Sequence, residues 1–256
     1  MGLFDKKSCD ICGGKIGLLG NRKLDDGNLC GDCAKKLSPF FSERRKSTVA
    51  SIVDHLAYRE ENKAAVSAFR ATRTIGQGTK VMLDEDNGKF LVTAARRLED
   101  DNPDVLDFSQ VTGCNIDTNE KSRELMQKGP DGKDKSYYPP RYEYEFELYC
   151  IIHVNHPWFT EIKFKINDRT IKLETTGTRT SSVGGATVGR GSADYNEATA
   201  LGNEIKSALT QVRRDVRAGA AAAAAPKTAQ TCPMCGATTM PDANGRCEYC
   251  GGAMQG

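Results

Sequence analysis

Hydrophobic and polar positions change their period along this chain. Between residues 47 and 73, apolar side chains recur three and four positions apart, and Ser47 and Thr48 stand where they can cap a helix. From 79 to 175 the period falls to two. It is clearest in residues 142–148, where aromatic or apolar side chains alternate with glutamates. The pattern therefore predicts one helix followed by about seven strands.

The segments between and after these strands complete the predicted outline. An Asn-Gly pair at 87–88 favours a tight hairpin. Residues 121–140 contain Gly-Pro-Asp-Gly and Pro-Pro, which predict a long mobile loop. Residues 176–192 are rich in Gly, Ser and Thr and predict a second such loop. Residues 193–217 have apolar side chains on one helical face, so we expect an amphipathic helix after the strands.

Eight of the ten cysteines form four C-x-x-C pairs, two near each end of the chain. Such a short loop points both sulfurs at one metal ion, so two pairs complete a tetrahedral site. The N-terminal pairs are separated by 17 residues and the C-terminal pairs by 11. Four thiolates leave no open coordination position, so we expect two structural zinc ions (Zn2+) and no catalytic metal. The predicted metal ligands are Cys9, Cys12, Cys30, Cys33, Cys232, Cys235, Cys247 and Cys250.

The residues around the pairs fit metal binding better than redox chemistry. Gly13 and Gly14 follow the first pair, which lets the backbone turn tightly and aim its amides at the thiolates. A glycine also follows each C-terminal pair. The alternative, two redox motifs, needs a βαβ context that the pattern lacks. The last module is too short to bury a core, so a metal ion must supply its folding energy.

The middle of the chain offers weaker chemistry. Cys150, His153 and His156 have ligand-like spacing, but Cys150 and His153 fall on opposite faces of the predicted strand. We therefore expect ordinary core or surface residues there, and Cys114 has no assigned role either. No nucleophile with its supporting base can be assembled from three histidines, so an enzyme is not expected.

Composition and charge further limit which classes of protein this chain can belong to. The net charge is +2, with 38% hydrophobic residues, and no apolar run approaches the roughly 20 residues that cross a bilayer. The N-terminus has no apolar stretch behind its charges, so we expect no secretory signal and a cytoplasmic location. Residues 1–47 carry ten basic and six acidic side chains, whereas residues 75–180 carry 15 and 19. A basic head and an acidic middle indicate separate units.

These patterns predict an α+β chain of five parts. The alanine-rich run after residue 217 is either a frayed helix end or a linker. The parts are a four-cysteine zinc finger at 1–46, a connecting helix at 47–74, a β-domain at 75–217, a linker at 218–229 and a four-cysteine zinc ribbon at 230–256.

Several segments resemble known modules. The N-terminal pairs, with a helix start at Ala34–Leu37, resemble a treble-clef zinc finger, and the C-terminal pairs resemble the small zinc ribbons of bacterial proteins. The strand pattern, the segment 104–113 and the closing helix resemble a pleckstrin-homology-like (PH-like) domain. That resemblance implies a seven-stranded antiparallel barrel closed by a C-terminal helix. Together these modules resemble an uncharacterised family of bacterial proteins, which implies no activity.

Two functions remain open. The first is a non-enzymatic adaptor that binds protein partners, with peripheral membrane contact as one setting. The second is a nucleic-acid-binding or regulatory protein, because clustered cations can bind phosphates. The near-neutral total charge and the acidic middle favour the adaptor. The cations of the head are Lys6, Lys7, Lys15, Arg22, Lys23, Lys35, Lys36, Arg44, Arg45 and Lys46.

Overall fold

The computed structural model describes residues 7–176, 192–224, 229–242 and 245–254. The chain forms two compact units, Met1–Arg213 and Arg214–Gly256. Residues 177–191, which include nearly all of the second predicted loop, lie outside the described ranges, as does 225–228 of the predicted linker. The five domain boundaries derived from the sequence stay predictions.

The first unit begins with short elements around the N-terminal cysteines, followed by one long helix. These elements are β1 (Arg22–Lys23), β2 (Asn28–Leu29), α1 (Gly31–Ala34), the 3-10 turn η1 (Arg44–Lys46) and α2 (Val49–Ala68). The hydroxyl of Thr48 accepts a hydrogen bond from the Ser51 amide and caps α2, as the sequence predicts. The helix ends five residues earlier than expected, because Phe69 is buried with extended backbone and the Arg70 amide donates to the Asp84 carboxylate.

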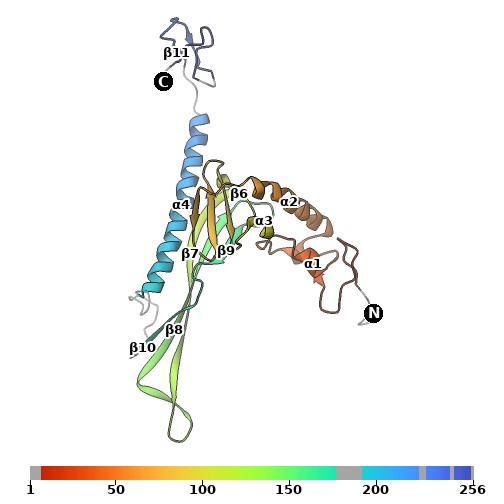
Figure 1. Ribbon diagram of the computed structural model, residues 1–256, viewed down its shortest axis with the longest axis vertical. Coiled ribbons are helices and arrows are strands. Elements are labelled where there is room, and N and C mark those ends of the chain that lie inside the picture. Colours follow the sequence, from red (N-terminus) through yellow and green to blue (C-terminus); the bar gives the residue numbers. More distant parts are fainter. Residues whose placement is uncertain (1–6, 177–191, 225–228, 243–244, 255–256) are drawn as a thin grey trace. The chain divides into compact units, whose positions relative to one another are not determined.

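Two antiparallel sheets follow α2 (Figure 1). In the first, strands β3 (Arg73–Ile75), β4 (Lys80–Asp84), β5 (Lys89–Thr93) and β6 (Leu106–Asp107) pair in that order. The second contains β7 (Val111–Lys128), β8 (Asp134–Val154), β9 (Glu161–Lys165) and β10 (Ile171–Thr176), with β7, β9 and β10 all paired to β8. Two short turns, α3 (Leu98–Asp101) and η2 (Phe108–Gln110), lie between β5 and β7.

The predicted closed, seven-stranded barrel is not observed. Within the described residues there are two separate sheets, and no hydrogen-bonded ladder joins them into a closed barrel. Strands β7 and β8 have 18 and 21 residues, against five or six in β9 and β10. Barrel closure requires a consistent stagger of neighbouring strands all round. The outer part of the β7–β8 ladder has no such neighbour on the β7 side and runs on as a two-stranded ribbon (Figure 1).

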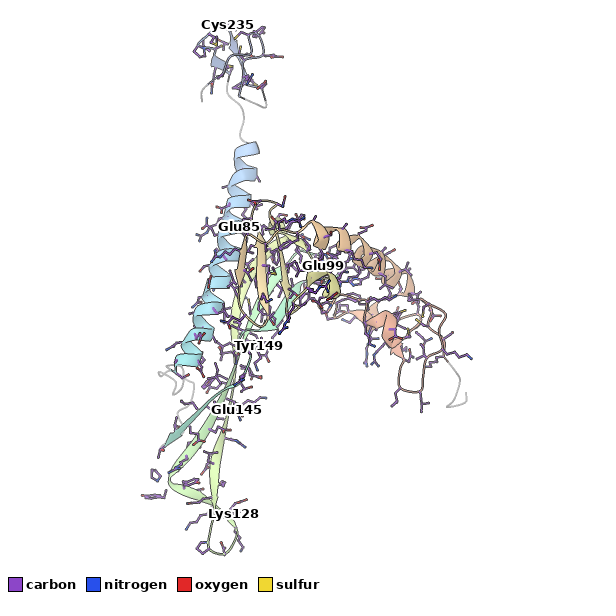
Figure 2. The ribbon with its side chains drawn as sticks, in the orientation of Figure 1. Glu85, Glu99, Lys128, Glu145, Tyr149 and Cys235 are labelled. Atoms are coloured by element: carbon purple, nitrogen blue, oxygen red, sulfur yellow. The ribbon has the colours of Figure 1, made fainter. Side chains whose placement is uncertain are left out.

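The prediction of a long mobile loop at residues 121–140 is wrong. Most of this segment is strand, and only residues 129–133 form the connection between β7 and β8. Lys128 and Asp134 form an ion pair of 2.7 Å at the end of this ribbon, where Figure 2 labels Lys128. Pro139 and Pro140 of β8 lack an amide donor. They lie opposite the shift in strand register between Leu125 and Met126 of β7. Polar cross-strand pairs hold this ribbon, so no apolar alternation marked it in the sequence.

Helix α4 (Ala193–Ala224) covers part of the second sheet and is longer than the predicted helix at 193–217. Gly202 permits a close approach, since a Cβ atom there would lie 3.0 Å from the side chains of Ile116 and Ile166. The rings of Tyr195 and Phe146 are 5.3 Å apart, edge to face. The N-terminal half of α4 is therefore part of the core of the first unit.

We expect removal of residues 219–256 to leave the thermal transition of the larger unit nearly unchanged. Among the α4 residues whose burial the structure describes, Val212 is the last buried one, so the deletion takes away none of them. Circular dichroism melting of the truncated and full chains would measure this. A fall in melting temperature of more than about 4 °C, roughly 1 kcal/mol or more for a unit of this size, would contradict the boundary.

Candidate metal centres

The structure brings the four N-terminal cysteines to one point. Their sulfur atoms all lie within 4.8 Å of one another, and the Cys12 and Cys30 sulfurs are 3.8 Å apart. Cys9 and Cys12 lie in a tight turn closed by a hydrogen bond from the Gly13 amide to the Cys9 carbonyl, and Gly13 has a φ of 71°. Cys30 is the N-cap residue of α1, and Cys33 lies within that helix. Two local structures, a glycine turn and a helix start, therefore position the four ligands.

Backbone amides point at these thiols. The Cys30 amide donates to the Cys9 sulfur at 3.3 Å, and the Cys33 amide donates to the Cys30 sulfur at 3.4 Å. Burial acts to raise the pKa of the Cys9 thiol, but hydrogen bonds from neighbouring amides outweigh it and lower this pKa to about 6. Burial and the neighbouring cysteines raise the pKa of Cys33. Four thiolates cannot ionise side by side without a cation, so the arrangement suits a bound metal ion.

The C-terminal unit repeats this arrangement with two glycine turns. The Cys232 and Cys250 sulfurs are 3.6 Å apart, and those of Cys235 and Cys247 are 3.7 Å apart (Cys235 is labelled in Figure 2). Gly236 and Gly251 follow the pairs with φ of 73° and 70°. Strands β11 (Gln230–Thr231) and β12 (Thr238–Thr239) hold the first pair. The buried core of this unit consists of Cys232, Cys247 and Met254.

The spacing of the sulfurs fits a tetrahedral metal ion. Zn–S bonds of about 2.3 Å place the sulfurs of a regular tetrahedron about 3.8 Å apart. The three sulfur–sulfur distances given above, 3.6, 3.7 and 3.8 Å, match that edge, and all sulfurs of each cluster lie within 4.8 Å of one another. All eight predicted ligands thus fall into two clusters that could each hold a metal ion. Among the residues that the structure describes, these are the groups of His, Cys, Asp and Glu close enough to do so.

The remaining cysteines and histidines of the middle segment are not brought into such a group. Cys114 and Cys150 are buried with their sulfurs 3.6 Å apart. His153 contacts the Asn115 amide group and the Glu161 carboxylate instead, and the ring of His156 lies 4.2 Å from that of Phe159. Cys150 is buried and His153 is partly exposed, so the two lie on opposite faces of β8 as the sequence predicts.

A buried charged network, which the sequence pattern did not reveal, joins the metal-binding end to the sheets. The carboxylate of Asp104 accepts hydrogen bonds from the Ser38 hydroxyl at 2.7 Å, the Tyr58 hydroxyl at 3.0 Å and the Arg59 guanidinium at 2.8 Å. The Ser38 amide donates to the His55 ring at 3.0 Å. The side chains of Arg59 and Asp104 are only 7% and 0% exposed. His55, Arg59 and Asn62 do recur at helical spacing on α2, but polar side chains in a sequence give no sign of burial, so the pattern did not identify this contact.

The comparisons with known proteins agree with the position of the first cluster. Both four-cysteine clusters could hold a metal ion, which suggests a metal-binding protein. Residues 7–55, which include the N-terminal cluster and the start of α2, match the family described as "Domain of unknown function (DUF4428)". No curated protein and no solved structure matches the chain. Among the helices in the described ranges, none has the length and apolar character needed to cross a membrane.

Proposed function

We propose that this chain is a non-enzymatic adaptor, stabilised by two structural zinc ions, that binds protein partners. The observation that carries the proposal is the composition of both clusters. Each brings four sulfurs within 4.8 Å of one another, so a zinc ion bound by all four would have no free position for water or substrate. The metal would supply folding energy to modules with small cores, and the rest of the chain would present surfaces to partners.

The middle of the chain is the part that we assign to partner binding. Its two antiparallel sheets and the packing of α4 support a PH-like arrangement, though an open one. Folds of this kind bind lipid head groups, peptides or other domains, so the fold alone does not choose a ligand. A surface cavity of about 650 Å³ lies between α4 and the β3–β4 and β9–β10 connections. Asp168, Asp194, Glu197 and Glu204 line it beside Arg169, which favours a protein segment with basic side chains.

Nucleic-acid binding is the second candidate, because the N-terminal end carries clustered cations. We expect only weak association of the full chain with DNA or RNA, lost at physiological salt, since the acidic middle offsets attraction to a polyanion. Fluorescence anisotropy with labelled single-stranded RNA and duplex DNA over a salt series would measure this. Reversing Lys35, Lys36, Arg44 and Arg45 to Glu should abolish what binding exists. Submicromolar binding to a defined nucleic acid that persists at high salt would overturn the adaptor proposal.

A further inference from the structure

The turn after the first cysteine pair presents two leucines to solvent. Leu18 and Leu19 are 81% and 90% exposed. They occupy the central positions of a β-turn closed by a hydrogen bond of 2.9 Å from the Gly20 amide to the Gly17 carbonyl. Ile16, just before the turn, is buried in the core around the cysteines and anchors its base. We call this turn the Leu-Leu tip. It exposes apolar surface on a fixed scaffold, which in soluble proteins marks a contact site.

Four cations gather beside the tip. Arg22, Lys23, Arg44 and Arg45 line a surface pocket of about 500 Å³, and we call them the basic cluster. Among the described residues none of them forms an ion pair, although Lys35 and Lys46 of the same module do. The remaining lining residues are Asn21, Leu24 and Asp25.

The cations of the basic cluster are held close to one another. The Arg44 guanidinium donates to the Lys23 carbonyl at 2.9 Å, which ties η1 to β1. Burial, and then the positive charges of Arg45 and Arg22, hold the pKa of Arg44 below its usual range. Four positive charges lie close together in this lining, and Asp25 is its single carboxylate. Such an excess of positive charge attracts an anion.

The tip and the basic cluster lie close together along the chain. Only two residues separate Leu19 from Arg22, so their Cα atoms are at most about 11 Å apart. Leucines that enter the hydrocarbon boundary and cations that meet phosphates just outside it are the two signals that together hold a peripheral protein at a bilayer. Neither signal alone gives stable binding.

We infer that the Leu-Leu tip and the basic cluster form a docking site for an anionic phospholipid membrane. This goes beyond the proposed adaptor function, since it names a surface and a partner that the protein-binding region does not involve. Nucleic acid fits the same cations less well. Proteins that bind single strands stack the bases mainly on aromatic side chains, and the lining of this pocket contains no aromatic residue. Two exposed leucines contribute nothing to phosphate binding, but they suit a lipid interface.

Vesicle sedimentation of the zinc-loaded full chain tests the inference. We expect at least tenfold tighter binding to vesicles of phosphatidylcholine with phosphatidylserine than to phosphatidylcholine alone. Leu18→Ser with Leu19→Ser should weaken binding about tenfold or more, because each leucine loses its transfer into the interface. Arg44→Glu with Arg45→Glu should weaken it at least about 25-fold, because each substitution removes a contact worth about fivefold and adds a carboxylate that the anionic surface repels.

A matched control separates this site from net charge. Lys35→Glu with Lys36→Glu changes the charge by the same amount but lies outside the basic cluster, on α1's C-terminal side, where the Lys36 carbonyl accepts from Arg59. Its effect should stay below about fivefold. Each variant is first checked for unchanged zinc content and melting temperature. If a variant fails that check, Leu19→Trp replaces it, and quenching of its added fluorescence by brominated lipid reports insertion directly.

Three results would overturn the inference. One is equal binding to both kinds of vesicle, and another is equal loss in the two charge-reversal variants. The third is RNA binding as tight as vesicle binding and unaffected by the leucine substitutions, which would assign the basic cluster to nucleic acid instead.

Discussion

Replacement of one ligand in the first metal cluster should have the largest effect on this protein. The zinc-loaded chain is expected to contain two zinc ions, and Cys33→Ser to contain one. Structural zinc contributes about 10–16 kcal/mol in apparent binding free energy, so the module around Cys33 should unfold. Ile52 of α2 belongs to the same buried core as Cys9 and Cys33, so the loss should reach α2. Elemental analysis of anaerobically purified protein and amide hydrogen exchange would measure both effects.

The second cluster provides a comparison within the same chain. Cys247→Ser should also remove one zinc ion but should leave the melting of the first unit unchanged, because Cys247 belongs to the core of the second unit. Cys114→Ser, outside both clusters, should keep two zinc ions. Absence of metal from the parent protein, or disulfides within the C-x-x-C pairs, would disprove the zinc assignment.

Asp104→Asn should produce the second largest effect. The substitution leaves the Arg59 guanidinium buried without its counter-charge, and breaking a buried pair on one side costs about 3–5 kcal/mol. The hydrogen bonds from Ser38 and Tyr58 weaken as well, since both donate to the carboxylate. Urea denaturation followed by circular dichroism would give the change in the free energy of unfolding of the first unit.

The same substitution at an exposed pair is the control. Asp134 is 64% exposed and pairs with Lys128 at the end of the ribbon, so Asp134→Asn should cost about 1 kcal/mol or less. Similar losses for the two variants would mean that Asp104 does not have the structural role that its contacts indicate.

Features encoded by neighbouring residues could be predicted from the sequence. The C-x-x-C pairs with their glycines form the turns that the spacing indicates, because four or five consecutive residues decide them. Thr48 caps α2 through an amide three residues away. The amphipathic helix after the strands is also present, since its pattern repeats within the helix itself.

Features that join distant residues were decided only by the tertiary structure. Asp104 accepts hydrogen bonds from Ser38 and Arg59, which lie 66 and 45 positions away in the sequence. No local pattern identifies a buried carboxylate whose partners are so distant in the chain. The basic cluster unites Arg22 with Arg44, which the sequence presents merely as members of a basic head.

The outer end of the β7–β8 ladder is held by polar pairs such as Lys128 with Asp134, so residues 121–140 show no alternation of apolar and polar side chains, unlike residues 142–148 further along β8. Sequence by itself therefore determined the two four-cysteine clusters and the local elements of this protein. The tertiary structure decided how charges far apart in the chain meet, because a buried or clustered charge depends on the neighbours that folding brings to it.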